Sequence, residues 1–385
     1  MFAVGVDAYI VAAVLPAISD DLHEPIARVG LLASSYALPM ALLAPVFGPL
    51  SDRRGRRYAL RLGLAIFAAA AAACVVAPNL GLLLVTRAIN GLGAAIILPA
   101  AIAKAGDLPT EAERGRAIGV LGAVFPLSTL IGLPIGAAVT IATGWRGPFA
   151  FIALVALVAI AGVGRLPADK ATGQPARYVD SLRSIVHDRR ALAIMAVTFL
   201  WFGGAFGLFV YVAEFVHRSF GIPADRAGLV YVVVGLVGII AARTSGNFIA
   251  TIGPRRTVLI GLSLFAAAVF VLPLTTVALP LALLVFAVWA FGVWLGIPAL
   301  NTIVAGLSED ERGSRLAFNS SAQSLSNVVG PIVTGAIITN WGFAVAGPYT
   351  SLLGLSTLTL AWLVLPRPAP SAPKAGAEQA PIIEA

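Results

Sequence analysis

The sequence predicts an all-α membrane protein of twelve transmembrane helices, arranged as two halves of six. Three observations predict this fold: a very apolar composition, a series of apolar runs of spanning length, and a sequence pattern that recurs at one fixed offset. Of the 385 residues, 59% are hydrophobic and 11% are charged, whereas about 25% of residues in a soluble protein are charged. A soluble fold of this length could not cover so much apolar surface, so lipid must contact much of it.

Apolar runs long enough to cross a bilayer follow one another along most of the chain. A spanning helix needs about 20 mainly apolar residues. The runs lie near residues 2–18, 29–50, 58–77, 80–104, 116–141, 145–166, 191–217, 223–250, 256–278, 279–307, 314–339 and 343–365. The ninth and tenth runs are separated only by the stretch from Pro273 to Pro280.

Basic residues are distributed unevenly between alternate loops. The loops on one side hold twenty Lys and Arg residues, and the loops on the other side hold four. Because cytoplasmic loops carry an excess of Lys and Arg, we expect a multi-pass protein of a bacterial inner membrane with both termini in the cytoplasm. The basic residues behind the formal charge of +8 lie in short loops between apolar runs, where they set topology, so we expect a lipid bilayer and no nucleic acid as partner.

One long internal loop, polar and basic, divides the spans six and six. We therefore expect an N-terminal six-helix bundle at 1–166, a cytoplasmic loop at 167–190 and a C-terminal six-helix bundle at 191–365. Residues 366–385 contain five prolines and show no helical periodicity. This composition predicts a disordered cytoplasmic tail.

The two halves share a sequence pattern at an offset of 198 residues. The matching positions are Gly48 with Gly246, Gly55 with Gly253, Arg57 with Arg255, Glu113 with Glu311, Arg114 with Arg312, and Gly115 with Gly313. Two separate segments that share one offset indicate an internal duplication. The sequence therefore predicts two homologous halves of six helices each.

The connection between the second and third runs reads G-P-L-S-D-R-R-G-R-R at 48–57. Gly48 permits close helix approach, and Gly55 can take a positive φ in a tight turn. Asp52 can accept charge-assisted hydrogen bonds from nearby arginines. The candidate donors are Arg53, Arg56 and Arg57. An alternative is that the cluster serves only as a topology signal.

This loop and the duplicated halves resemble the major facilitator superfamily, whose signature in this loop is G-x-L-x-D-R-x-G-R-R. The resemblance covers residues 2–365 and implies two pseudo-twofold-related six-helix bundles with a substrate site between them near the midplane. It also implies that the loop latches the cytoplasmic side when the transporter faces outward. In the second half Ala250 stands opposite Asp52, so only the first latch is expected to be intact.

The fourth run carries Arg87 in the segment L-V-T-R-A-I-N-G-L-G. An arginine at the centre of a span costs at least about 2.5–3.5 kcal/mol and tends to face the protein interior or water. The segment resembles the family pattern R-x-x-x-G-x-G, in which a buried arginine is linked to proton coupling. The alternative is a structural arginine that binds carbonyl groups near a helix end.

The fifth run combines small residues with a proline at Gly132, Pro134 and Gly136. Small residues let helices pack closely, and a proline lets a helix bend. The run is similar to the antiporter motif G-x-x-x-G-P-x-x-G-G, with two departures at Leu133 and Ala137. The resemblance favours export over import, and generic helix packing is the alternative.

The first run contains Asp7, nine residues before Pro16. A carboxyl group inside a span can alternate between a neutral and a charged form as it meets water on either side. The spacing resembles the D-x-x-x-x-x-x-x-L-P pattern of drug:proton antiporters, which implies a proton carrier. The alternative is an Asp7 that merely lies near the cytoplasmic mouth, because only six residues precede it.

Other polar and aromatic residues in the runs are candidates for the cavity lining, although aromatic residues in spans more often pack or anchor at the interface. These candidates are Tyr9, Tyr36, Asn90, Phe125, Trp201, Tyr211, Trp289, Trp294, Asn301, Asn319 and Gln323. Glu214, at the outer end of the seventh run, is expected to be a solvated rim residue. Arg243 is expected to extend toward the cytoplasm.

The sequence contains no phosphate-binding Gly-Lys-Ser/Thr loop, which argues against ATP-driven transport. It also shows no nucleophile–base arrangement and no metal-ligand spacing, so we expect no enzyme, cofactor or metal site. The chain is most similar to the twelve-helix drug:proton antiporter branch, including the chloramphenicol-resistance and arabinose-efflux-like permeases. This resemblance implies proton-coupled efflux of a small, partly apolar drug or metabolite by alternating access, with Asp7 carrying the proton and Arg87 tuning it. We expect a monomer.

Two other functions stay open at this point. The first is a proton-coupled or facilitative importer of a small metabolite, which the direction of uptake in oriented vesicles would separate from an exporter. The second is a transport-dead sensor or scaffold that keeps the fold, which labelled-substrate flux in proteoliposomes would separate from a transporter.

Overall fold

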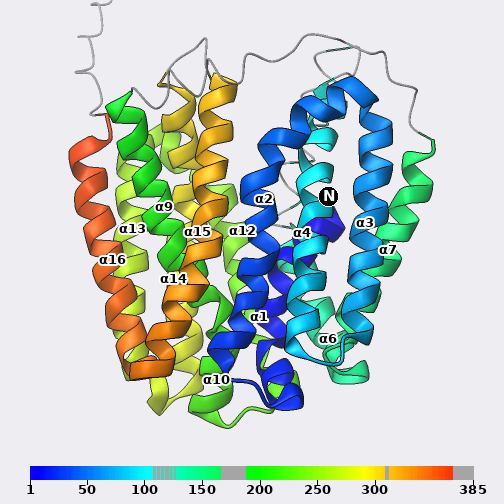
Figure 1. The fold of residues 1–385 in the computed structure, drawn as a ribbon. Coiled ribbons are helices and arrows are strands. Elements are labelled where there is room, and N and C mark those ends of the chain that lie inside the picture. The colour runs from blue at the N-terminus through cyan, green and yellow to red at the C-terminus, as the bar shows by residue number, and fades with distance from the viewer. Residues whose placement is uncertain are drawn as a thin grey trace, which may run out of the picture.

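The computed structural model describes residues 1–106, 110, 113, 117, 121, 124, 127–165, 188–307 and 312–366. In this part of the chain, helical segments correspond to all twelve predicted spans. Two groups of helices stand side by side with their long axes roughly parallel (Figure 1). The twelve-helix fold predicted from the sequence is confirmed.

The first group contains α1 (Phe2–Leu22), α2 (Ile26–Arg54), α3 (Arg56–Val76), α4 (Leu80–Gly106), η1 (Ser128–Gly132), α6 (Leu133–Thr143) and α7 (Gly147–Val163). The second contains α9 (Arg189–Val210), α10 (Val212–Phe220), α11 (Ala224–Ala227), α12 (Val230–Ile252), α13 (Pro254–Val271), η2 (Leu272–Val277), α14 (Leu279–Ala305), α15 (Arg312–Trp341) and α16 (Phe343–Val364). Among the described residues, nine helices are long and apolar enough to cross a membrane. The segments Pro134–Thr143 and Gly147–Val163 are apolar but shorter.

Three predicted spans are interrupted in the structure. The seventh divides at Tyr211 into α9 and α10, and the eighth begins with the separate turn α11. The ninth ends in the 3₁₀ turn η2, which contains Pro273. A proline cannot donate a backbone hydrogen bond, and the α-helix gives way to a 3₁₀ turn at this point. The boundary between the ninth and tenth spans therefore lies between Pro273 and Pro280, where the sequence predicts it.

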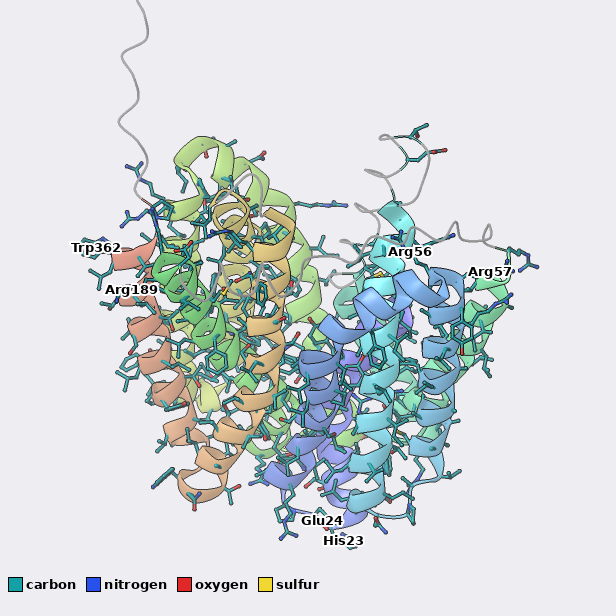
Figure 2. All side chains as sticks on the ribbon, turned by 45° about the horizontal axis from the view of Figure 1, so that its top comes forward. His23, Glu24, Arg56, Arg57, Arg189 and Trp362 are labelled. Atoms are coloured by element: carbon teal, nitrogen blue, oxygen red, sulfur yellow. The ribbon has the colours of Figure 1, made fainter. Side chains whose placement is uncertain are left out.

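The two ends of the molecule differ in charge. Arg56 and Arg57 lie at one end, which we call the arginine-rich end, and His23 and Glu24 lie at the opposite end (Figure 2). The first residue of the chain lies inside the first group, well short of the arginine-rich ends of α2 and α3 (Figure 1). The start of α1 is therefore surrounded by other helices.

The duplication predicted from the sequence is visible in the backbone. Gly55 and Gly253, 198 residues apart, each begin a helix with a positive φ, of 92° and 85°. Gly144 and Gly342 have the same separation, and each has a φ of 75°. Only glycine adopts such backbone conformations without strain. The positive φ expected at Gly55 is confirmed, and it recurs in the second half.

The same relation holds for two arginine contacts. The guanidinium group of Arg57 donates a hydrogen bond to the carbonyl oxygen of Gly164. The guanidinium group of Arg255 donates one to the carbonyl oxygen of Trp362, over 2.7 Å. The donors are 198 residues apart and so are the acceptors. The third helix of each half is thus fastened to the end of the sixth in an equivalent way.

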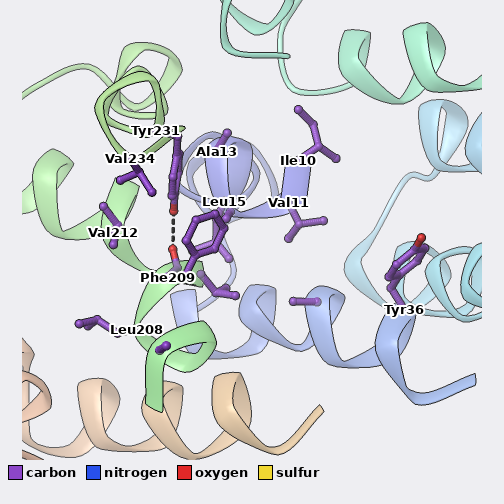
Figure 3. Packing of buried hydrophobic residues seen from close by; sticks show 14 of the residues in the cluster. Ile10, Val11, Ala13, Leu15, Tyr36, Leu208, Phe209, Val212, Tyr231 and Val234 are labelled. Atoms are coloured by element: carbon purple, nitrogen blue, oxygen red, sulfur yellow. Dashed lines mark hydrogen bonds between the residues drawn. The ribbon is translucent and has the colours of Figure 1, made fainter. Parts of the chain in front are cut away.

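The two groups pack against each other through α1, α2, η1 and α6. Helix α2 packs against α15, α1 contacts α9, α10 and α11, and η1 and α6 contact α12. Ile10, Val11 and Leu15 of α1 lie in a buried apolar cluster with Leu208 and Phe209 of α9 (Figure 3). These contacts hold the halves together toward the opposite end, where α10 and α11 lie.

Candidate functional site

Asp7 and Arg87 form a buried ion pair in the N-terminal bundle. Nη1 of Arg87 lies 2.6 Å and 2.7 Å from the two carboxylate oxygens of Asp7, and Nη2 donates to the backbone oxygen of Asp7 over 3.1 Å. Both side chains are 0% exposed. The sequence singled out both residues, but only the structure shows that they bind each other. Asp7 is therefore enclosed by protein and carries a direct ionic partner.

Aromatic rings enclose the guanidinium group. The ring of Tyr36 lies 4.4 Å from the guanidinium carbon of Arg87, and the ring of Phe149 lies 5.8 Å away. Such cation–π contacts stabilise a desolvated cation. The hydroxyl group of Tyr36 donates to the carbonyl oxygen of Val4, one turn before Asp7. Helices α1, α2, α4 and α7 therefore fix the orientation of the pair.

Two neighbouring polar atoms are left without partners. Within the described residues, Nε of Arg87 and Oδ1 of Asn90 are buried and make no hydrogen bond. Asn90 uses its amide NH2 group to donate to the carbonyl oxygen of Phe67 over 3.0 Å. Buried polar atoms without partners are uncommon in proteins. The site thus keeps spare hydrogen-bonding capacity next to the ion pair.

The helix 5 motif lies directly against the segment of α1 that carries Asp7. A Cβ atom placed on Gly132 would lie 2.3 Å from Cγ2 of Val6, and one on Gly136 would lie 1.9 Å from Cδ1 of Ile10. Gly132 ends the π-helical turn η1, and Pro134 is the second residue of α6. The absence of side chains on this face lets α1 approach closely on both sides of Asp7.

This packing predicts different effects for two similar substitutions. Gly132→Ala is expected to destabilise the fold by about 1–3 kcal/mol through overpacking, because Val6 is β-branched and holds one rotamer in a helix. Gly136→Ala is expected to cost less, because the atom it meets is the mobile end of Ile10. Thermal unfolding of the purified variants measures both effects.

The matched control is the double variant Gly132→Ala/Val6→Ala, which removes the obstructing methyl groups. We expect it to regain most of the stability and transport lost in Gly132→Ala. Equal losses in the Gly132 and Gly136 variants, or no recovery in the double variant, would contradict this account of the motif.

Tyr9 and Trp289 belong to an aromatic cluster between the bundles. The ring of Tyr9 lies 5.5 Å from that of Phe209, whose ring lies 4.7 Å from that of Tyr231 and 6.1 Å from that of Trp289. The hydroxyl group of Tyr231 donates to the carbonyl oxygen of Phe209 (Figure 3). Tyr9 is the member from the N-terminal bundle, so the cluster spans the interface between the halves.

Tyr211 is a wedge between the bundles rather than an open cavity residue. It is fully buried, and its hydroxyl group donates to the carbonyl oxygen of Pro331 over 2.9 Å. A Cβ atom on Gly30 of α2 would lie 2.0 Å from this hydroxyl oxygen, and one on Gly335 of α15 would lie 2.3 Å from it. Close by, the hydroxyl group of Ser34 donates to the carbonyl oxygen of Val328 over 2.7 Å.

The other cavity candidates on the C-terminal bundle have varied surroundings. Asn319 is buried, accepts a hydrogen bond from Thr198 over 2.5 Å and donates one to the exposed Asn301 over 3.1 Å. Trp201 is buried against Gly296, and Trp294 packs on Gly238. Gln323 is half-buried on α15. Phe125 lies outside the described residues.

The signature loop is described in part. Helix α2 continues through Gly48, Asp52 and Arg53, whose surroundings lie outside the described side chains. The guanidinium group of Arg56 donates to the carbonyl oxygen of Ala103 near the end of α4. With the contact of Arg57 described above, this arginine pair fastens the start of α3 to two neighbouring helices at the arginine-rich end.

The expectation that Glu214 is a solvated rim residue is wrong. Glu214 is 2% exposed and pairs with Arg218 one turn later on α10. A one-residue turn at Tyr211 separates α10 from α9. Its neighbour His217 places Nε2 at 3.8 Å from a carboxylate oxygen of Asp20 on α1. This contact joins the two bundles at the opposite end.

Sequence reasoning missed one ion pair at the arginine-rich end. Asp188 caps α9 by accepting from the backbone N–H groups of Arg190 and Ala191, and Arg315 of α15 donates to it over 2.7 Å. The hydrogen bond from Arg315, helped by the N–H group of Ala191, holds the pKa of Asp188 below its ordinary value. An aspartate just before an apolar run is an N-cap signal, so the sequence could have predicted the role of Asp188 but not its pairing with Arg315.

Comparison with known proteins places the chain among transporters. The sequence profile of the Major Facilitator Superfamily matches residues 1–308 and 215–385. Multidrug resistance protein 1 of Bacillus subtilis is 28% identical over 362 residues, which cover 92% of each chain. The uncharacterized MFS-type transporter YbcL of the same organism is 24% identical over 94% of this chain and 93% of its own. The crystal structure of the nucleoside transporter NupG superposes with a TM-score of 0.78 at 11% identity, over 94% of this chain and 98% of its own.

Proposed function

Because the chain belongs to the major facilitator superfamily, whose members are transporters and not enzymes, we propose that it exports a small, partly apolar molecule in exchange for protons. The bundles alternate between a state open to one side of the membrane and a state open to the other. The observation that carries the proposal is the buried pair of Asp7 and Arg87, which joins the first and fourth helices of one bundle.

Proton coupling follows from the chemistry of this pair. The charged form of Asp7 binds Arg87 through both carboxylate oxygens. A proton on Asp7 removes its negative charge, weakens the attraction to Arg87 and lets α1 and α4 shift relative to each other. A buried ionisable pair in a span is a typical proton relay in transporters. Asp7 is thus the proton carrier and Arg87 the residue that tunes it.

The direction of transport rests on the helix 5 motif and on the relatives. The glycine face at Gly132 and Gly136 supports α1 on both sides of Asp7, as an antiporter motif would. The similar proteins include two named multidrug resistance proteins and one named a multidrug transporter, at 25–28% identity. An outward flow of drug or metabolite agrees with both observations.

The proposal includes the placement of the chain in the membrane. The arginine-rich end is cytoplasmic, the start of α1 and the end of α16 face that side, and the membrane is a bacterial inner membrane. Residues 1–166 and 191–365 are the moving bundles, joined by 167–190, and the protein acts as a monomer. The bundle contacts near Tyr211 and His217 then seal the external side, while Arg56, Arg57 and the rest of the 48–57 loop control the cytoplasmic gate.

The test is proton-driven efflux by the Asp7→Asn variant. Purified protein is reconstituted in liposomes, a pH gradient is imposed, and flux of a labelled drug such as chloramphenicol is followed in both directions. We expect the wild type to respond to the gradient and Asp7→Asn to lose that response. The control is Asp21→Asn, at the end of α1, which should keep it. Gradient-driven efflux that survives in Asp7→Asn would refute the carrier assignment, and net uptake by the wild type would favour an importer.

A further inference from the structure

Helix α15 carries a stripe of uncharged polar side chains in the middle of its length. We propose that this stripe, Ser320, Gln323, Ser324 and Asn327, binds the substrate, and that the substrate is an uncharged molecule with hydrogen-bonding groups. This inference rests on the proposed transport function and names the substrate class. The four residues recur at i, i+3, i+4 and i+7, so they lie on one face of the helix.

The opposite face of α15 identifies the lipid side. Leu325 and Ile332, seven residues apart, are each 44% exposed. With 3.6 residues per turn, the centre of the polar stripe lies roughly 140° from these two residues. Exposed apolar side chains in a spanning helix meet lipid, whereas a polar group without a partner is costly there. The stripe therefore points away from lipid.

Contacts on the two flanks give the direction more closely. One flank of α15 lies against α9, where Asn319 binds Thr198 and Gly330 packs on Gly203 and Gly207. The other flank lies against α2, where the carbonyl oxygen of Val328 accepts from Ser34. The stripe lies between these flanks, so it faces the space between the bundles. One turn beyond it, Tyr211 fills that space.

The stripe has free hydrogen-bonding capacity. Its members are exposed or half-buried, and the buried Oδ1 of Asn327 has no partner within the described residues. Ser320 and Ser324 donate to carbonyl oxygens of their own helix, which leaves their lone pairs as acceptors. These two side-chain amides and two hydroxyl groups can hydrogen-bond to amide, carbonyl and hydroxyl groups of a ligand. Such neutral ligand groups need no opposite charge on the protein.

The buried carboxylates argue against a cationic substrate. The buried carboxylates among the described residues are Asp7 and Glu214. Each already has an arginine partner, Arg87 and Arg218 respectively. A cation that left water for the space between the bundles would need a carboxylate to offset its desolvation. Neither Asp7 nor Glu214 could pair with such a cation without breaking its existing ion pair.

The first experiment tests where the stripe faces. Cys74 is the only cysteine of the chain, so Cys74→Ala provides a background for single cysteines at Gln323, Asn327 and Leu325. A charged, membrane-impermeant maleimide is added to detergent-free vesicles of either orientation. We expect Gln323→Cys and Asn327→Cys to react from water and Leu325→Cys to stay unlabelled. Labelling of Leu325→Cys with the other two protected would overturn the inference.

The second experiment tests the ligand class by binding, independently of transport. Tryptophan fluorescence of the purified full chain is titrated with chloramphenicol, which is uncharged and carries amide and hydroxyl groups, and with the cation tetraphenylphosphonium. We expect chloramphenicol to bind, and Asn327→Leu to weaken this binding about tenfold because hydrogen bonds are lost. The control Leu325→Ala, on the lipid face, should bind as the wild type does.

The outcomes separate this inference from the proposed function. Binding of tetraphenylphosphonium but not chloramphenicol, or unchanged binding by Asn327→Leu, would overturn the inference and leave proton-driven export intact. If the chain binds chloramphenicol through Asn327, but no imposed proton gradient drives its transport, the inference stands and the proposed function is refuted.

Discussion

Replacing Arg87 by methionine is expected to give the largest loss of stability of any single substitution at the site. Methionine keeps much of the side-chain volume but leaves the carboxylate of Asp7 buried without a partner. Removing one member of a buried ion pair typically costs about 3–5 kcal/mol, because the remaining charge is uncompensated. The apparent unfolding temperature of the purified protein, measured in detergent, reports this loss.

A double variant separates the uncompensated charge from lost packing. In Arg87→Met/Asp7→Asn the charge is absent, so we expect much of the stability to return although proton-driven transport stays lost. Arg243→Met serves as a control, because Arg243 is exposed on α12, and it should unfold as the wild type does. An Arg87→Met variant as stable as the wild type would show that the pair contributes nothing to the fold.

The sequence could predict which residues form this site but not how they meet. Asp7 and Arg87 were visible because charges inside apolar runs are costly and need a reason. Their pairing depends on the rotation of α1 and α4 about their axes, which the apolar pattern of a spanning helix specifies poorly because lipid and protein interior are both apolar. The aromatic ring of Tyr36 over the guanidinium group depends on a third helix and was no easier to foresee.

The duplicated halves were predictable because the matching residues can be seen in the sequence itself, without knowledge of how the helices pack. Gly55 and Gly253 need a positive φ, and an offset of 198 residues can be read directly from the letters. Glu214 shows the opposite case. Its neighbours His217 and Arg218 suggested a solvated rim, but the carboxyl group is buried and pairs with Arg218. The packing that buries it depends on neighbouring helices, which the local sequence does not specify.

Substituting Gly30 by alanine is expected to shift the protein toward a state open at the opposite end. The added Cβ atom would lie 2.0 Å from the hydroxyl oxygen of Tyr211 and 2.6 Å from Cζ of its ring. Tyr211 cannot retreat easily, because its hydroxyl group binds the carbonyl oxygen of Pro331 and lies against Gly335. Overpacking of this kind costs about 1–3 kcal/mol. It destabilises only the state in which Gly30 of α2 lies against Tyr211.

That cost changes the ratio of the two states by roughly 5–150-fold, which a distance measurement detects. Spin labels on Arg28→Cys and Asn340→Cys, in a Cys74→Ala background, report the separation of α2 and α15 at the opposite end. We expect Gly30→Ala to lengthen this distance and to slow transport, and Gly246→Ala to leave both unchanged, because a Cβ atom there meets nothing within 4 Å. Adding Tyr211→Leu to Gly30→Ala removes the obstructing hydroxyl group and ring and should restore the shorter distance. If Gly30→Ala keeps the wild-type distance, the bundles do not close on Tyr211, and the external seal must lie elsewhere.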